Sequence, residues 1–225
     1  SPLSQIGKQV AVSSYPVGPP YLLHPRDWAR VIKLWVAMCP EVYARHPGIL
    51  AEMYGYCIGA AHIGLRHRVA YGLMVSDPTM EKEGWPMVDS LKTRACDASA
   101  IASQREHLPP LLHYCQMYRV GTYMYGKRHK NHHHFFSCGA DAFQEPPAHY
   151  LESPMGKVRI HPGREEPVTA DRATRQGYMM CSLLRYMNLA QAAFKQRYCS
   201  PDEISGDVWR FTDLKPKVVA ADQYG

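Results

Sequence analysis

The chain has 225 residues, and its 26 Lys and Arg side chains exceed its 20 Asp and Glu side chains by a formal charge of +6. The 46% hydrophobic content is ordinary for a chain that buries a core, and the 20% charged content is too low for a disordered polyelectrolyte. This composition excludes a collagen, a coiled coil and a disordered chain. The content of 16 Gly and 18 Pro favours many turns over a helical bundle.

Residues 1–25 are expected to form an irregular entry segment, because Pro and Gly recur through residues 13–20. Within this segment, residues 21–24 are a candidate for one short strand. The chain starts at Ser1-Pro2-Leu3 without Met, so a processed or truncated product is expected. No apolar run reaches the roughly 18 residues that cross a bilayer, so no transmembrane segment is predicted.

Two helices are predicted in the first third of the chain. The first covers residues 27–36, whose apolar side chains recur at helical spacing. Pro40 and Pro47-Gly48 bracket a predicted linker, and the second helix covers residues 49–66. Small side chains on this second helix would allow close packing against a neighbour: Gly55, Gly59, Ala60 and Ala61.

The sequence pattern in the middle of the chain predicts short strands and long loops. Strands are expected at residues 69–75, 111–115 and 120–125, whereas residues 76–107 are expected to be loops with at most one short helix. Residues 126–176 are rich in Pro, Gly, His and charge and show little regular pattern.

A last helix is predicted over residues 177–199, because apolar side chains recur there at helical spacing. It is followed by a polar tail at 201–225, so the main domain is expected to cover residues 26–200. Helices and short strands together predict an α/β or α+β fold with long irregular loops.

Seven cysteines lie far apart without a Cys-x-x-Cys pair, which argues against a zinc ribbon or a thioredoxin-type site. In an oxidising compartment their odd number leaves at least one free thiol, and in the cytosol all seven would be small buried side chains. The spacing leaves the compartment and the pairing open. The positive charge is spread along the chain, so nucleic acid is not an expected partner.

Glu52 is a lone carboxylate in an apolar and aromatic stretch, residues 49–56. If it were buried it would need a partner, a metal-bound group or a substrate hydroxyl, because desolvating a carboxylate is costly. Near a helix start it would equally suit an exposed position, where the helix dipole favours an acidic side chain. The spacing alone favours neither the buried nor the exposed interpretation.

His113 ends an apolar run and precedes Tyr114, Gln116 and Tyr118. A histidine at a strand end suits a metal ligand or a phosphate donor, but a lone histidine is more often simply hydrogen-bonded within the fold. Both interpretations stay open at this point.

Residues 127–134 (KRHKNHHH) are dense in nitrogen donors, and Lys127 and Arg128 would suit phosphate. Three adjacent histidines do not all reach one ion from a strand, so a solvated loop is favoured over a metal or anion site. The chain contains no nucleotide phosphate loop, no Gly-x-Gly-x-x-Gly and no Asp-x-Asp.

An ordered set of short strings resembles the plant and algal glycosyltransferases of hydroxyproline-rich proteins, namely the hydroxyproline O-arabinosyltransferases and the peptidyl serine α-galactosyltransferases. The order and spacing of these strings carry the resemblance, and we call them the matched strings. They are residues 17–24 (VGPPYLLH), 51–56 (AEMYGY), 110–121 (PLLHYCQMYRVG), 125–127 (YGK), 138–140 (CGA), 145–147 (EPP) and 187–190 (MNLA).

The resemblance implies a GT-A-type, Mn²⁺-dependent enzyme of the ER or Golgi. Such an enzyme transfers a sugar from a UDP-sugar, with retention, to Ser or hydroxyproline of a secreted protein. Glu52 would match the acidic residue of the acceptor-side helix, and His113 the histidine that completes the metal site and touches the donor diphosphate. Lys127 and Arg128 would lie near that diphosphate. A divalent ion and cations would neutralise the leaving nucleoside diphosphate, while a carboxylate orients the acceptor or stabilises oxocarbenium charge.

In that family a nucleotide-binding half with an Asp-x-Asp-type motif precedes the matched region, and this chain starts after it. The matched region is therefore expected to be the C-terminal, acceptor-side part of a GT-A-like domain, and to be incomplete as an enzyme on its own. The alternative hypothesis is a non-catalytic structural or accessory subunit of a larger assembly, derived from a glycosyltransferase. A Tyr-rich composition and long Pro-rich loops suit such protein contacts.

Overall fold

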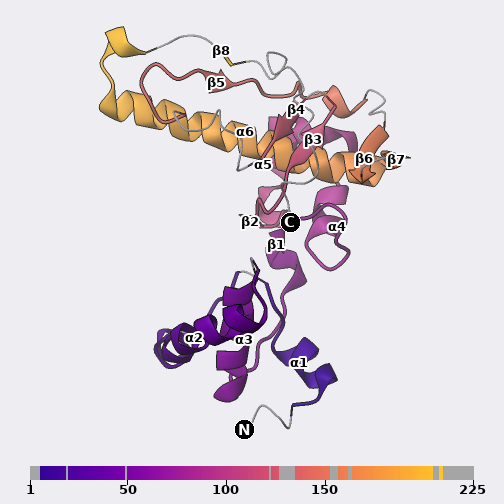
Figure 1. Ribbon diagram of the computed structural model, residues 1–225. Helices are drawn as coiled ribbons and strands as arrows, with labels where there is room; N and C mark the ends of the chain where they lie inside the picture. The colour runs from indigo at the N-terminus through magenta and orange to yellow at the C-terminus, as the bar shows by residue number, and fades with distance from the viewer. Residues whose placement is uncertain are drawn as a thin grey trace. The chain divides into compact units, whose positions relative to one another are not determined.

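The computed structural model describes residues 6–18, 20–48, 50–121, 123–126, 135–152, 157–161, 164–204 and 208–209. The chain divides into two compact units, residues 1–70 (unit 1) and 71–225 (unit 2). Helices dominate both units and short strands occur in unit 2, so the fold belongs to the mixed helix-and-strand class that the sequence predicts (Figure 1).

Unit 1 contains three helices, α1 (Lys8–Ser14), α2 (Pro25–Arg45) and α3 (Ala51–His62). At the start of α2, the His24 ring accepts a hydrogen bond from the backbone N–H of Arg26 at 3.2 Å, and Pro25 occupies the first turn. Pro is well suited to that position because its missing N–H would be unpaired there anyway. Local chemistry thus explains where α2 begins.

The predicted bounds of these elements needed correction. Helix α1 lies within the entry segment expected to be irregular, and residues 21–24 form no strand. Helix α2 passes through Pro40, where a linker was expected. Pro40 and Val36 are both exposed, so water can reach the Val36 carbonyl that loses its helical partner. The second predicted helix is confirmed as α3, with shorter bounds.

Helices α2 and α3 pack closely because α3 presents glycines to α2. A Cβ added at Gly59 would lie 3.3 Å from Leu34 Cβ and 3.3 Å from the backbone N of Trp35, and one at Gly55 would lie 2.9 Å from Cys39 Sγ. The prediction that small side chains permit a close approach is confirmed at these two positions. The indole Nε1 of Trp35 then donates to the Glu52 carbonyl at 2.7 Å, which joins the two helices by a polar contact.

An aromatic cluster forms the core of unit 1. Tyr56 is fully buried, with its ring centroid 3.9 Å from that of Tyr21 and 5.5 Å from that of Trp35. Its hydroxyl lies 2.7 Å from Nε2 of His67, whose Nδ1 is buried and has no hydrogen-bond partner among the described residues. Burial raises the pKa of Tyr56 to about 12 and lowers the pKa of His67. Both shifts favour the neutral forms of the two groups.

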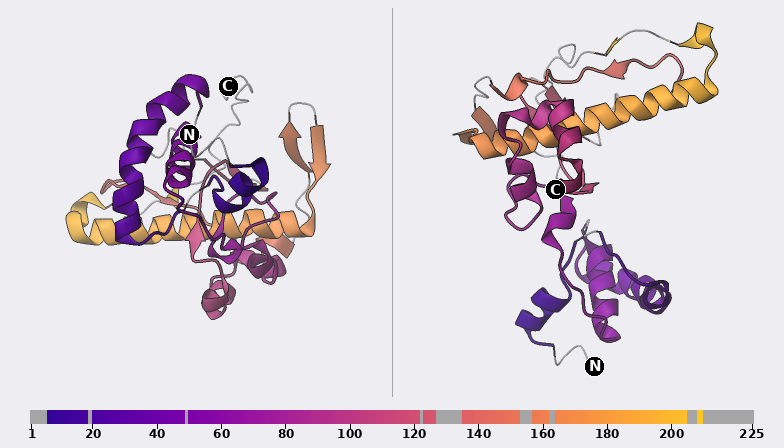
Figure 2. Two further views of the ribbon diagram at one scale, coloured as in Figure 1. Left: turned by 90° about the horizontal axis from the view of Figure 1, so that it is seen from below. Right: turned by 180° about the vertical axis from the view of Figure 1, so that it is seen from behind.

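Unit 2 is built around one long helix, α6 (Ala170–Tyr198). Its N-cap is Thr169, whose hydroxyl accepts from the backbone N–H of Arg172 at 3.2 Å. The helix predicted over 177–199 is confirmed, but it starts seven residues earlier, at Ala170. Figure 2 shows the other described elements of unit 2 gathered along this helix. Most side chains of its first half are buried: Ala173, Thr174, Gln176, Gly177, Tyr178, Met179, Met180, Cys181, Ser182 and Leu184.

Short helices cover α6 where the sequence predicted mainly loops. They are α4 (Trp85–Asp89), a 3₁₀-helix at Lys92–Cys96 and α5 (Ala98–Ser103). Arg175 of α6 holds α4 with two hydrogen bonds to the Asp89 carboxylate, at 2.8 and 2.7 Å. The expectation of at most one short helix was wrong, because tertiary contacts with α6 stabilise turns that are too short to show a pattern.

The described strands pair as two-stranded ladders. Two ladders are parallel, β1 (Met74–Val75) with β2 (Leu111–Leu112) and β5 (Ala142–Phe143) with β8 (Val208–Trp209). Two are antiparallel, β3 (Tyr118–Val120) with β4 (Tyr123–Tyr125) and β6 (Lys157–His161) with β7 (Arg164–Pro167).

The predicted strands at 69–75 and 111–115 are therefore confirmed only at β1 and β2. The segment at 120–125 is part of the β3–β4 hairpin. Its turn contains Gly121 at φ 55°, where a side chain would also collide with the Tyr150 hydroxyl. Contrary to the expectation for residues 126–176, that stretch contains strands and the start of α6.

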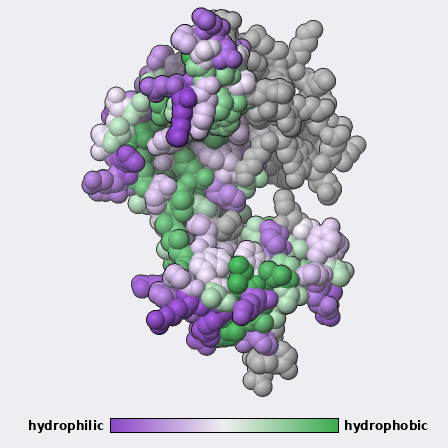
Figure 3. Space-filling view, turned by 90° about the vertical axis from the view of Figure 1, so that its left-hand side faces the viewer, coloured by the Kyte–Doolittle hydropathy of each residue, from purple (hydrophilic) through white to green (hydrophobic). Residues whose placement is uncertain are grey.

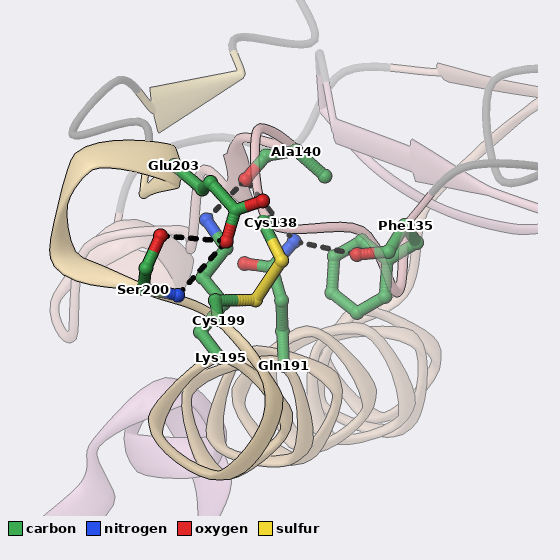
Figure 4. The surroundings of a disulfide bond; sticks show 8 residues. All are labelled: Phe135, Cys138, Ala140, Gln191, Lys195, Cys199, Ser200 and Glu203. Carbon is green, nitrogen blue, oxygen red and sulfur yellow. Dashed lines mark hydrogen bonds between the residues drawn. A yellow bond between two sulfur atoms is a disulfide. The ribbon is translucent and has the colours of Figure 1, made fainter.

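Two disulfides close long loops of unit 2. Cys96–Cys181 ties the 3₁₀-helix at Lys92–Cys96 to the buried part of α6, and Cys138–Cys199 ties the end of α6 to the segment before β5 (Figure 4). Cys39, Cys57 and Cys115 are free. No helix in the described part of the chain is both long and apolar enough to cross a membrane.

Gly59→Val tests the close approach of α2 and α3. The new side chain would meet the backbone of α2, so we expect unit 1 to lose about 2 kcal/mol of unfolding free energy. The measurement is urea unfolding read by pulse proteolysis, with cleavage inside residues 1–70 identified by mass spectrometry. Gly48→Val is the control, because nothing lies within 4 Å of a Cβ there. Equal losses in both variants would contradict the packing argument.

The buried ring of His67 predicts a pH dependence for unit 1. Desolvation lowers its folded-state pKa, against a smaller opposing effect of the Ser14 backbone. The unfolded chain therefore takes up the proton first as the pH falls. The contribution of His67 is complete above about pH 6.5 and is lost as the pH drops towards the lowered value. The same proteolysis assay at pH 7.5 and 5.5 should show this loss, reduced in His67→Gln and unchanged in His62→Gln, which alters an exposed histidine.

Candidate functional site

His113 lies in unit 2, directly after β2. Its backbone N–H donates to the Val75 carbonyl at 2.9 Å, which extends the β1–β2 ladder by one bond. Its own carbonyl accepts a hydrogen bond from the Tyr118 hydroxyl at 3.1 Å. The half-buried side chain of His113 thus projects from a backbone that is held on both sides.

Tyr118 organises the turn that carries His113. Its side chain is fully buried, and its hydroxyl lies 2.9 Å from the Ser76 carbonyl, so one hydroxyl hydrogen serves the carbonyls of Ser76 and His113. The same oxygen accepts from the backbone N–H of Cys115 at 3.3 Å. Burial is the main cause that raises the pKa of Tyr118, followed by Cys115. The neutral hydroxyl therefore hydrogen-bonds three backbone groups, those of Ser76, His113 and Cys115.

An acidic loop follows β1 next to this turn. The Glu83 carboxylate accepts from the backbone N–H of Ser76 at 2.6 Å and from its hydroxyl at 2.5 Å. Asp77 accepts from the backbone N–H of Thr79 at 2.9 Å, and its carbonyl accepts from the Trp85 indole at 2.9 Å. These contacts shape the loop itself, so both carboxylates are already used for local structure.

A manganese ion needs several oxygen or nitrogen ligands, and the resemblance implies His113 as one of them. Nowhere in the described ranges do three His, Cys, Asp or Glu side chains come close enough to hold a metal ion. Within those ranges, His113 by itself does not make a fit for the Mn²⁺ that the resemblance implies.

Glu52 lies in unit 1, on the exposed side of the first turn of α3. Of the two interpretations left open by the sequence, the solvent-facing carboxylate near a helix start describes this position. A shallow, open hollow lies nearby between the end of α2 and the start of α3, lined by side chains that include Arg45, His46, Leu50 and Tyr54. Glu52 is not part of its lining.

The predicted site residues are not brought together within one unit. Glu52 belongs to unit 1 and His113 to unit 2. Lys127 and Arg128 lie outside the described residues, as does the whole run 127–134 with its suggested metal or anion site. Their assignment therefore stays a prediction.

The structure does bring together matched strings that lie far apart in the sequence. The Asn188 side chain, in string 187–190, accepts from the backbone N–H of Phe143 and donates to its carbonyl, both at 2.8 Å. It also donates to the Glu145 carboxylate of string 145–147 at 3.1 Å. The other carboxylate oxygen of Glu145 lies 3.4 Å from Nε of Arg185.

Further along α6, two more side chains hold the segment before β5 (Figure 4). Gln191 donates to the Phe135 carbonyl at 2.8 Å and to the Asp141 carbonyl at 3.1 Å. Lys195, only 8% exposed, donates to the Ala140 carbonyl. The Cys138–Cys199 disulfide lies beside these contacts and connects string 138–140 to the helix end.

Sequence reasoning missed this row of polar side chains. Asn188, Gln191 and Lys195 are spaced at i, i+3 and i+7, so they share one face of α6. Polar residues at helical spacing beside an apolar stripe are the signal that would have found them. They satisfy backbone carbonyls of an irregular segment, which, among the described residues, is paired as a strand only at β5.

Comparison with known proteins gives no assignment. No family model matches the chain, and no match was found among curated proteins or solved structures.

Tyr118→Phe tests how the His113 turn is held. Removing the hydroxyl takes the donor away from the buried Ser76 carbonyl, whereas the Cys115 N–H still donates to the His113 carbonyl at 3.1 Å, so we expect a loss of about 1–3 kcal/mol from unit 2. Pulse proteolysis in urea, with cleavage mapped to residues 71–225, measures the loss. Tyr71→Phe alters a tyrosine that is 52% exposed and should change stability by less than about 0.5 kcal/mol. Similar losses in the two variants would remove Tyr118 from its organising role.

Proposed function

We propose that this chain is the acceptor-side part of a GT-A-type glycosyltransferase, which transfers a sugar from a UDP-sugar to Ser or hydroxyproline of a secreted protein with retention. The observation that carries the proposal is the contact between matched strings. Strings 145–147 and 187–190 are 43 residues apart at Glu145 and Asn188 and meet through the hydrogen bond between these two side chains. The Cys138–Cys199 disulfide ties string 138–140 to the end of the same helix, beyond string 187–190. Strings that share one packing role support a common origin better than isolated likenesses do.

The disulfides support the cellular setting of the proposal. Disulfides persist in oxidising compartments and are rare in the cytosol. Cys96–Cys181 and Cys138–Cys199 pair four of the seven cysteines. A protein of the secretory pathway, where hydroxyproline-rich acceptors are modified in the family that this chain resembles, would form both bonds.

In this proposal each predicted residue has a separate task. His113 would be one ligand of a Mn²⁺ ion bound with the donor diphosphate, and Lys127 and Arg128 would add positive charge beside that diphosphate. Glu52 orients the acceptor hydroxyl or stabilises positive charge on the sugar. The ion, when bound, would neutralise the leaving diphosphate. Ligands beyond His113 have to come from outside the described residues.

A second candidate function is that of a non-catalytic accessory subunit derived from such an enzyme. The observation that favours it is the number of large apolar side chains on exposed helix faces, because apolar surface of this kind marks protein contacts. Examples are Val36 (68% exposed) and Tyr43 (60%) on α2, and Tyr186 (58%) and Leu189 (59%) on α6.

Nucleotide binding and transfer separate the two candidates. Because the acceptor-side part is expected to be incomplete as an enzyme, the full-length protein is titrated with UDP and Mn²⁺ in a calorimeter. It is then incubated with UDP-sugars and a Ser/Hyp peptide that is analysed by mass spectrometry. We expect His113→Ala to weaken UDP binding by at least about tenfold. Glu52→Gln should preserve UDP binding and lower transfer by about a hundredfold.

The matched controls are His107→Ala and Glu106→Gln, which alter exposed residues of unit 2 and should change neither measurement. Undiminished turnover in both test variants would contradict the site assignment. Absence of UDP binding by the native chain, together with its stable co-purification in a complex, would replace the enzyme by the accessory subunit.

A further inference from the structure

One face of α2 carries an exposed apolar stripe. Its members are Ala29, Ile32, Val36, Pro40 and Tyr43, of which Ile32 is 46%, Val36 68% and Tyr43 60% exposed. Their spacing of 3, 4, 4 and 3 residues confines them to an arc of about 80°, since successive residues of a helix are about 100° apart. We call this set the α2 seam. Figure 3 views the molecule from the side on which α2 lies in Figure 1 and shows hydrophobic residues among hydrophilic ones at the surface.

The α2 seam is separate from the face that α2 uses inside unit 1. Val31 (0% exposed) and Val42 (7%) bury the inner face, together with the contacts of Leu34 and Trp35 to α3. On a helical wheel the middle of this inner face lies about 140° from the middle of the seam. The core of unit 1 therefore does not account for the apolar character of the seam.

Positive charge borders the seam on its outer side. Arg26 and Lys33 are seven residues apart and lie next to it, and within the described part of the chain neither is in an ion pair. The neighbouring acids are already engaged, Asp27 with Arg30 at 3.3 Å and Glu41 with Arg45 at 2.5 Å. The border of the seam thus has a surplus of positive charge.

We propose that the α2 seam docks an amphipathic helix of a partner protein, with an apolar stripe of heptad spacing and acidic residues beside it. The large side chains of the seam, Ile32, Val36 and Tyr43, form a narrow stripe, and the exposed side chains on its outer side are small or charged. Such a stripe fits the groove-and-ridge contact of two helices, whereas helices that lie on a membrane present a broader face of large apolar side chains. Acidic residues on the partner would meet Arg26 and Lys33, as charges beside a coiled-coil seam do.

The same charges argue against a second copy of this chain as the occupant. Two copies joined in parallel through the seam would bring Arg26 and Lys33 near their own equivalents, and like charges across such a contact are destabilising. The stripe from Ala29 to Tyr43 spans about 21 Å, the length of one helix contact of two heptads. The proposal does not depend on the function proposed above.

A synthetic acidic peptide of about three heptads provides the probe, with Leu at positions a and d and Glu at positions e and g. Fluorescence anisotropy of the labelled peptide with the full chain should give a Kd on the order of 10 μM. Val36→Asp should weaken binding by at least about tenfold, because a carboxylate would enter the apolar seam. Val12→Asp is the matched control, since Val12 on α1 is 67% exposed and lies outside the seam.

Charge reversal gives the sharper test. A second peptide with Lys in place of every Glu should bind the native chain at least about fivefold more weakly. In the double variant Arg26→Glu with Lys33→Glu, the preference should reverse towards the Lys peptide. Circular dichroism verifies that each variant keeps its helical content.

Four results would overturn the proposal. They are absence of binding, equal binding of the two peptides to the native chain, binding that survives Val36→Asp, and an unchanged preference in the double variant. Other occupants of the seam would give different results. A dimer in light scattering, or flotation with anionic vesicles, that is lost in Val36→Asp would assign the seam to a second copy or to a membrane. A lower melting temperature in Val36→Asp but not in Val12→Asp would assign it to another part of this chain.

Discussion

Burial of the first half of α6 is the constraint on which unit 2 depends. From Ala173 to Leu184 nearly every side chain is enclosed, so this stretch has to be covered on all sides at once. The surrounding short helices and strands are too short to be stable alone and gain their stability from this contact. Gly177 shows how close the contact is, because a Cβ there would lie 2.6 Å from Leu151 Cδ1. The Cys96–Cys181 disulfide links one of these covering elements, the 3₁₀-helix at Lys92–Cys96, covalently to α6.

The second half of α6 is packed differently from the first. There a single side of the helix is covered, by an irregular segment whose backbone has to be satisfied by side chains. Asn188, Gln191 and Lys195 provide these hydrogen bonds, and Cys138–Cys199 closes the segment at the helix end. The opposite side of this half leaves Tyr186 and Leu189 exposed. One helix is thus a core element along its first turns and a scaffold for a loop along its last turns.

Sequence patterns predicted the parts of the fold that depend on local periodicity. The glycines of α3 and the apolar spacing of α6 are visible in the sequence, and both helices are present. The continuation of α2 through Pro40 was not predictable, because it depends on whether the freed Val36 carbonyl meets water or protein. Of the candidate site, a strand was predicted up to Cys115, but β2 ends at Leu112 and His113 follows it, so only the presence of a strand there was predicted correctly. That Tyr118 holds the turn carrying His113 was not predicted. Its hydroxyl bonds the backbone of Ser76, His113 and Cys115, and no sequence spacing rule connects position 118 with position 76.

The folding of unit 1 requires apolar residues on one face of α2 but not on the other. Val31 and Val42 have to be apolar because α3 covers their face, and polar residues there would unfold unit 1. Ile32, Val36 and Tyr43 face no such requirement, since polar side chains at these exposed positions would leave the core of unit 1 intact. Apolar residues at regular helical spacing on an exposed face therefore need a cause outside the packing of the unit. A docked partner helix supplies one, whether the chain acts as part of an enzyme or as a subunit of an assembly.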